Sequence, residues 1–91
     1  METEFDFGEG LVPAHRHPNG GGWVADTAFV DETAYVGPRA RVFGDARVSG
    51  KVQVFGDVRV FGEAWVSGNA WVFGKAQVSG KVIVSEEARI N

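Results

Sequence analysis

The sequence predicts an all-β protein in which short parallel strands wind into a β-helix, and three observations support this fold class. Aliphatic residues recur at every sixth position from Val24 to Ile90 without a gap. Alanine or valine stands two positions before each of them from Val30 onward, and glycine stands two positions after most of them. On a helix of 100° per residue, a six-residue period places successive aliphatic side chains about 240° apart, so they form no single stripe and an α-helix is excluded.

Each six-residue repeat is expected to form one short strand and one turn. In the repeat at 46–51, Ala46 and Val48 are two positions apart, so their side chains point to the same side of an extended strand, and Arg47 points outward between them. Gly50 suits the third position of a type II turn, which requires a positive φ. Every repeat therefore contributes two core residues and one corner.

Three repeats are expected to close one triangular coil of 18 residues, and alike positions of successive coils then stack at about 4.8 Å with backbone hydrogen bonds between them. Residues 23–91 supply just under four such coils. A chain of 91 residues allows one domain. The predicted organisation is a single domain with an N-terminal cap at 1–22 and a repeat β-helix at 23–91.

Residues 1–22 do not follow the repeat and are expected to form an irregular cap over the first coil. A stack of repeats needs a distinct end piece that covers its open edge and its core. Pro13, Pro18 and the glycines at 20–22 are expected to interrupt any regular element. The apolar anchors of this cap are expected to be Phe5, Phe7, Leu11 and Val12.

The repeat resembles that of the hexapeptide-repeat, left-handed parallel β-helix proteins over about three quarters of the chain. The left hand is implied by this resemblance alone, because crossovers between parallel strands are right-handed as a general rule. In many members glycine directly follows the aliphatic residue, whereas here it comes one position later. The entry at 21–24, followed by Ala-x-Val-x-Gly units, also resembles short phage and bacterial members of mostly unassigned function.

The 18-residue period sorts the outward residues between core positions into three columns, one for each face of the triangle. The first face carries Trp23, Arg41, Arg59 and Gln77. The second face carries Phe29, Arg47, Trp65 and Ile83. The third face carries Tyr35, Gln53, Trp71 and Arg89. Trp65 over Arg47 and Trp71 over Arg89 are therefore expected to be cation–π neighbours.

Two ladders of phenylalanine are expected at the corners that border the first face. One ladder consists of Phe43 and Phe61, and the other of Phe55 and Phe73. One interpretation is that stacked aromatic rings stabilise the coil itself. The other is that another chain covers this aromatic surface, because tryptophan, phenylalanine and arginine are enriched in interfaces.

No catalytic residue, metal or cofactor is expected. The resemblance implies enzymes as relatives, namely trimeric acyltransferases with a catalytic histidine between subunits and γ-class carbonic anhydrases with three zinc-binding histidines. Here the repeats contain no histidine, and His15 and His17 match no motif of those families. Two nitrogens are fewer than the three or four protein ligands of a zinc site, so both are interpreted as ordinary cap histidines.

The distribution of charge disfavours nucleic acid as a partner. Residues 1–22 carry the whole net charge of −3, so the repeats are neutral and provide no long-range attraction for a polyanion. No apolar run approaches the length of about 18 residues that a membrane span requires, and no signal peptide is evident. Without cysteine there is no disulfide framework. We expect no membrane partner and a cytoplasmic protein, in the host cytoplasm if phage-encoded.

The leading functional hypothesis is a non-enzymatic, self-associating module that binds protein or builds structure as a dimer or trimer, such as a phage particle component or an inhibitor of a host protein. One alternative is a trimeric acyltransferase-like protein without an evident catalytic histidine. Another is an oligomer that holds an anionic small molecule between subunits. The candidate interface or binding residues are Arg41, Phe43, Phe55, Arg59, Phe61, Phe73, Trp65, Trp71, Ile83 and Ile90.

The two ends of the β-helix are expected to differ. No cap follows the last coil, Val72–Ile90, in this sequence, so its strand edges are expected to pair with another chain. Ile83 and Ile90 would lie in that contact. The competing explanations are that the chain is a fragment of a longer protein, or that neighbours in a trimer cover the two isoleucines.

Overall fold

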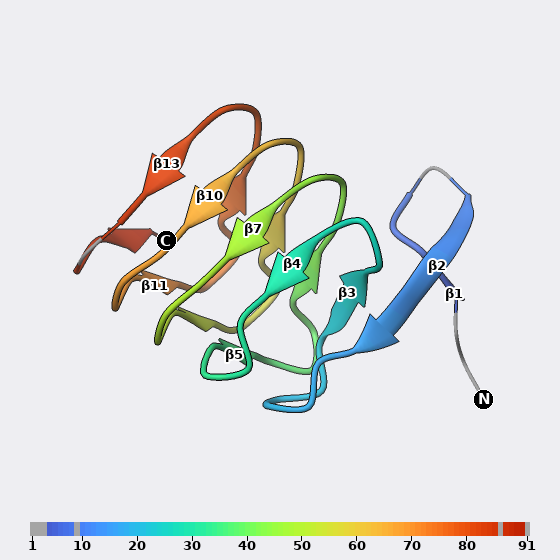
Figure 1. Cartoon of the computed structure of the whole chain (residues 1–91), viewed down its shortest axis with the longest axis horizontal. Coiled ribbons are helices and arrows are strands. Elements are labelled where there is room, and N and C mark those ends of the chain that lie inside the picture. The colour runs from blue at the N-terminus through green and yellow to red at the C-terminus, as the bar shows by residue number, and fades with distance from the viewer. Residues whose placement is uncertain (1–3, 9, 86, 91) are drawn as a thin grey trace.

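The computed structural model describes residues 4–8, 10–85 and 87–90 and confirms an all-β protein, a parallel β-solenoid of about four turns (Figure 1). Residues 1–3 and 9 of the predicted cap, and residues 86 and 91 of the predicted β-helix, lie outside the described residues. Every regular element in the described ranges is a strand. Accordingly, no helix among them is long and apolar enough to cross a membrane.

The solenoid consists of very short strands, as the repeat predicts, because a turn follows each pair of extended residues. It begins with β3 (Trp23–Ala25). The two-residue strands that follow are β4 (Phe29–Val30), β5 (Tyr35–Val36), β6 (Arg41–Val42), β7 (Arg47–Val48), β8 (Gln53–Val54), β9 (Arg59–Val60), β10 (Trp65–Val66), β11 (Trp71–Val72), β12 (Gln77–Val78), β13 (Ile83–Val84) and β14 (Arg89–Ile90).

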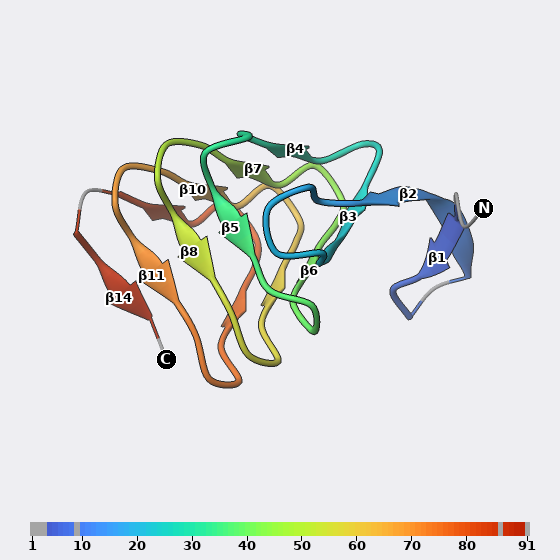
Figure 2. The ribbon, with the colours of Figure 1, turned by 90° about the horizontal axis from the view of Figure 1, so that it is seen from below.

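The strands form three parallel sheets, one for each predicted face. The first face contains β3, β6, β9 and β12, the second β4, β7, β10 and β13, and the third β5, β8, β11 and β14. Figure 2 shows the third-face strands side by side, with the N-terminus at the opposite end from the C-terminus. The register confirms the 18-residue coil, since Val42 pairs with Val60 and Val66 with Val84.

The core is a column of valine and alanine side chains inside the triangle. Val60, at its centre, is completely buried. The alanine or valine two positions before each repeating aliphatic residue is equally buried in the inner coils, where Val52 and Val58 are completely buried. In the last described coil, by contrast, Val82 is 44% exposed. An inner coil has neighbours on both sides, whereas Val82 has a neighbour on one side only.

Glycine makes the corners possible, as the sequence predicts. Gly62 has a φ of 72°, in the left-handed region where an L side chain is strained. Its carbonyl accepts a hydrogen bond from the N–H of Asp45 in the preceding coil at 2.8 Å. A Cβ at this position would lie 2.8 Å from the backbone nitrogen of Gly80 in the following coil. Successive corners therefore approach more closely than a side chain would allow.

The cap is regular, and the prediction of an irregular segment was wrong. Strands β1 (Glu4–Asp6) and β2 (Leu11–Arg16) form an antiparallel hairpin, and β2 pairs antiparallel with β3. The hairpin extends the first-face sheet to six strands, which supplies hydrogen-bond partners to the otherwise open edge of β3. Pro13 does not interrupt β2 because it lies where the ladder to β3 ends, and its carbonyl accepts the N–H of Asp26 at 2.9 Å.

Two of the four predicted cap anchors are confirmed. Phe5 and Phe7 pack with Trp23, Ala14 and Ala25 in a second small core, so Trp23 is only 6% exposed although the repeat predicts it to face outward. Leu11 and Val12 are exposed, contrary to expectation. They precede Ala14, where pairing with β3 begins.

Candidate functional site

The outward side of the first face brings together the arginines, the phenylalanine ladders and the cap. Arg41 in β6 and Arg59 in β9 are paired in register, as predicted. Arg41 is half-buried, with its guanidinium carbon 5.1 Å from the centre of the Phe5 ring. Arg59 is exposed, and within the described ranges its guanidinium makes no hydrogen bond or ion pair. The hairpin thus holds one of the two predicted arginines in place.

Cations and aromatic rings alternate where the hairpin joins the first-face sheet. The ring of Trp23 is stacked on that of Phe5, with centres 4.7 Å apart and planes inclined by 22°. The guanidinium carbon of Arg16 lies 4.7 Å from the centre of the Trp23 ring, and Arg41 lies over Phe5. Such contacts contribute about 0.5–1 kcal/mol each at exposed sites and restrict the side chains involved.

A cationic cavity of about 410 Å³ lies between this stack and the coil corner. Four arginine side chains line it: Arg16, Arg39, Arg41 and Arg59. Of the described residues in its lining, Asp57 is the acidic one, and its carboxylate oxygen lies 3.5 Å from Nε of Arg39. Sequence analysis found Arg41 and Arg59 but missed the other two, because Arg16 is in the cap and Arg39 is in a corner outside the columns.

A second, largely apolar cavity of about 560 Å³ lies beside it. Phe7, Val12 and Pro13 of the cap line one side, and Phe43 and Phe61 of the solenoid line another. Arg59 lines this cavity as well as the cationic one. The two cavities together are called the first-face cleft below.

Both phenylalanine ladders are confirmed as stacks. The rings of Phe43 and Phe61 are 4.9 Å apart and inclined by 4°, and those of Phe55 and Phe73 are 5.4 Å apart and inclined by 10°. Phe7 continues the first ladder by stacking on Phe43 at 4.8 Å. The interpretation that these rings stabilise the coil is supported, and coverage by another chain stays a prediction.

The second face carries an exposed apolar column. Phe29, Trp65 and Ile83 are 55%, 48% and 70% exposed, and Arg47 interrupts them. The guanidinium carbon of Arg47 lies 5.9 Å from the centre of the Trp65 ring, as predicted. On the third face, the predicted contact of Arg89 with Trp71 is also present at 4.8 Å. Of the two predicted C-terminal isoleucines, Ile90 instead packs partly buried against the core.

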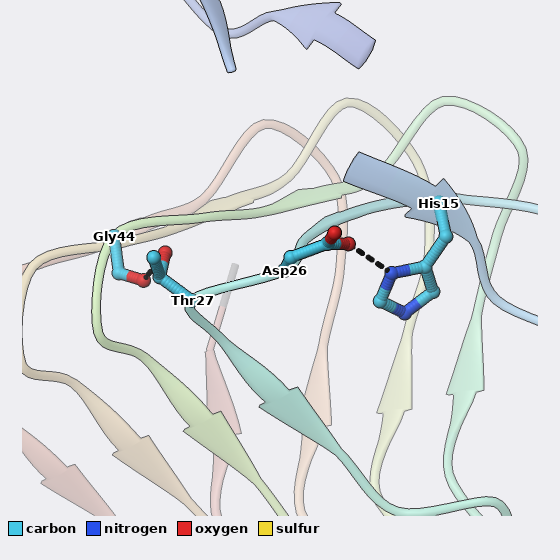
Figure 3. A network of polar contacts seen from close by, with 4 residues as sticks. All are labelled: His15, Asp26, Thr27 and Gly44. Atoms are coloured by element: carbon cyan, nitrogen blue, oxygen red, sulfur yellow. Dashed lines mark hydrogen bonds and ion pairs between the residues drawn. The ribbon is translucent and has the colours of Figure 1, made fainter. Parts of the chain in front are cut away.

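The two histidines of the cap contact different parts of the solenoid. Nδ1 of His15 lies 2.8 Å from a carboxylate oxygen of Asp26, and the hydroxyl of Thr27 donates to the carbonyl of Gly44. In Figure 3 the Thr27 hydroxyl lies beside Gly44 and away from the His15 ring. His17 is buried, and its Nε2 lies 2.8 Å from the carbonyl of Ala34.

Metal ligation finds no support in this geometry. Each histidine is bonded to a different part of the solenoid, so the two rings do not converge on a common point. Within residues 4–8, 10–85 and 87–90, no group of three or more histidine, cysteine or acidic side chains is arranged to hold a metal ion. The hydrogen bonds tie the cap to the first coil.

The carboxyl of Asp31, whose pKa is lowered, lies away from the cleft. The backbone N–H and then the hydroxyl of Thr33 donate to the carboxylate of Asp31, each at 3.1 Å, and hold the pKa of Asp31 below its ordinary value. The oxygen of the same hydroxyl lies 2.7 Å from the carbonyl oxygen of Gly50 in the next coil, so its single proton is shared between these two acceptors. This carboxylate stabilises a turn.

The family model described as the YdcK beta solenoid repeat matches residues 40–54 and 52–68. The matched segment lies in the middle of the solenoid and includes Arg41, Arg59 and Trp65. Comparison with curated proteins gave no match, and neither did comparison with solved structures. The similarity supports a β-solenoid repeat protein, while membership of the hexapeptide-repeat proteins stays a prediction.

Proposed function

We propose that this chain is a non-catalytic β-solenoid module that self-associates through its second face. The observation that carries the proposal is the exposed apolar column of Phe29, Trp65 and Ile83 on one sheet. Solvent-exposed apolar groups of this size on a neighbouring set of strands are typical of interaction surfaces. Tryptophan in particular is enriched among residues that dominate binding energy.

The shape of the surface favours a second copy of the same chain as the partner. The second-face sheet of each copy is regular and parallel. Two such sheets can pack face to face at about 10 Å with interdigitating side chains. A two-fold contact would bring the column of each copy against that of the other and would then be complete, because such an interface is self-complementary. The interruption of the column by Arg47 limits its apolar area, so we expect a modest, concentration-dependent association.

The second face also reaches an open sheet edge. β13 is the last strand of its sheet, Ile83 is its outward residue, and the adjacent Val82 is 44% exposed. Contact through the face and pairing through the last described coil would therefore share Ile83. Both modes belong to the proposal, and a substitution at this residue weakens either one.

The experiment places arginine at outward positions of the second face, where the chain itself already has one arginine. Arg47 occupies the same column, so the coil accepts arginine there. We expect the double variant Trp65→Arg/Ile83→Arg to be monomeric in sedimentation velocity at concentrations where the wild type associates. The matched control, Gln53→Arg/Gln77→Arg, adds the same two charges to the other two faces and should associate like the wild type.

Two results would contradict the proposal. One is a wild type that stays monomeric over the whole accessible concentration range. The other is a double variant that folds, by its circular dichroism spectrum, and associates as strongly as the wild type. A protein of this kind would serve as a structural component or as a binder of another protein, the context that the resemblance to short phage and bacterial hexapeptide-repeat proteins favours. The acyltransferase-like alternative is less well supported, because the repeats contain no histidine and His17 is buried.

A further inference from the structure

We propose that the first-face cleft is a ligand site within a single copy of the chain, for a small organic oxyanion that joins a carboxylate or phosphate group to an aromatic or acyl group. The anionic group would lie among Arg39, Arg41 and Arg59, and the apolar part against Phe43 and Phe61. The site is separate from the second face and does not require association.

The concentration of positive charge is the first argument. Four of the six arginines in the chain line a single cavity of about 410 Å³, although the chain as a whole carries a net charge of −3. Arg41 and Arg59 are register partners on adjacent strands, where like charges repel each other. Among the described residues that line the cavity, Asp57 is the acidic one, and it engages Arg39. An anion bound here would relieve the repulsion between Arg41 and Arg59.

The placement of the guanidinium groups is the second argument. Arg41 is held over the ring of Phe5, and Arg39 lies beside Asp57. Both side chains are therefore partly ordered before a ligand binds, which lowers the entropic cost of binding. Arg59 makes no hydrogen bond or ion pair within the described part of the chain, which leaves its donors available. Guanidinium groups bind carboxylate and phosphate oxygens through two parallel hydrogen bonds, so this residue type fits an oxyanion.

The adjoining apolar cavity specifies the rest of the ligand. Arg59 lines both cavities, so an anionic group held by it would sit at the entrance to the apolar one. There the parallel rings of Phe43 and Phe61 and the side chain of Phe7 offer surfaces for a flat ring or an acyl chain. The two volumes, about 410 and 560 Å³, fall in the range of about 300–1,000 Å³ for small-molecule sites.

The sequence left open, as one alternative, an oligomer that holds an anionic small molecule between subunits. The structure instead completes the site with the cap of the same chain, which contributes Phe7 to the apolar cavity and Arg16 to the cationic one. A hollow closed on one side by the cap favours a compact ligand over a polyanion such as nucleic acid, for which a continuous basic groove would be needed.

The test measures binding of small probes to the full chain by isothermal titration calorimetry. Phenyl phosphate and benzoate carry both required parts, inorganic phosphate carries only the anion, and phenol only the ring. We expect phenyl phosphate or benzoate to bind more tightly than inorganic phosphate or phenol. Preference between the first two identifies the oxyanion as phosphate or carboxylate.

Substitutions locate the site. Arg59→Gln should weaken binding by about tenfold or more, since a charge-assisted hydrogen bond contributes about 1.5–3 kcal/mol. The matched control is Arg47→Gln, which removes the same charge from the second face and should bind the probes like the wild type. The variant Trp65→Arg/Ile83→Arg, designed above to be monomeric, should also retain binding, because the cleft is complete within one copy.

Three outcomes would overturn the proposal. The wild type would bind none of the probes, or Arg59→Gln would bind them unchanged, or Arg47→Gln would lose as much affinity as Arg59→Gln, which would indicate nonspecific attraction. Loss of binding in folded Trp65→Arg/Ile83→Arg would show that the site lies between subunits instead. Self-association is measured separately by sedimentation, so either proposal can fail without the other.

Discussion

The close approach of stacked corners can be tested with two glycines that share a backbone conformation but differ in the space around them. Gly62 and Gly80 are one coil apart, and both have a φ of 72°. A Cβ at Gly62 would lie 2.8 Å from the backbone nitrogen of Gly80, whereas a Cβ at Gly80 would have no atom within 4 Å. Alanine at the two positions therefore separates backbone strain from steric overlap.

The expected effects follow from adding these two contributions. Placing alanine in the left-handed region costs about 1–2 kcal/mol, and this cost applies to both variants. The overlap applies to Gly62→Ala alone, and forcing an extra methyl group into a packed region costs about 1–3 kcal/mol. We therefore expect Gly80→Ala to lose about 1–2 kcal/mol and Gly62→Ala about 2–5 kcal/mol of the free energy of unfolding.

Thermal and urea unfolding followed by circular dichroism provide the measurement. For a domain of this size, each kcal/mol shifts the midpoint by about 4–8 °C, so Gly62→Ala should melt at least about 4 °C below Gly80→Ala. Equal midpoints would show that the coils have room for a methyl group at the corner. A lower midpoint for Gly80→Ala would refute the reasoning entirely, because that position has the same strain and open space.

Two further predictions concern the core and a surface carboxylate. Val60→Asp should unfold the protein, because Val60 is completely buried and an unpaired carboxylate there costs several kcal/mol, a large share of a total free energy of unfolding of about 5–15 kcal/mol. The control Arg59→Asp puts the same group on the exposed side of the same strand and should stay folded. A thermal midpoint of Val60→Asp within a few degrees of the wild type would place this residue outside the core. The lowered pKa of Asp31 means that its turn contributes stability above the ordinary carboxyl pKa and loses it as the pH falls through the folded-state pKa. Thr33→Val removes the hydroxyl donor but keeps the backbone N–H, so the Asp31 pKa measured by carboxyl NMR should rise part of the way, and an unchanged pKa would show that the hydroxyl has no role.

The solenoid could be predicted from the sequence because its interactions repeat. A residue such as Val60 meets its own equivalents 18 positions away on both sides, so a single period determines the strand, the turn, the register and the buried side chain. The cation–π contact of Arg47 with Trp65 follows from the same arithmetic. The exceptions occur at the ends of the stack, where Val82 is exposed although Val52, at the same position of the repeat, is buried.

The candidate cleft could be predicted only in part. Arg41, Arg59 and the phenylalanine ladders belong to the repeat, so the period placed them on or beside one face. The cap has no period, and its strand pairing depends on the open edge of β3, which exists only once the solenoid has formed. For that reason the burial of Trp23 and the addition of Arg16 to the cavity were not foreseen.

By itself, the sequence determined the period, the three faces and the columns of side chains on them, because each of these depends on local spacing and on contacts between identical positions. Only the tertiary structure decided that residues 4–6 and 11–16 form a hairpin that extends the first-face sheet beyond β3, with Phe5 on Trp23 and Phe7 on Phe43. The physical reason is that those contacts join segments with no common repeat, so they depend on shape and on open hydrogen-bonding edges, which no local pattern encodes.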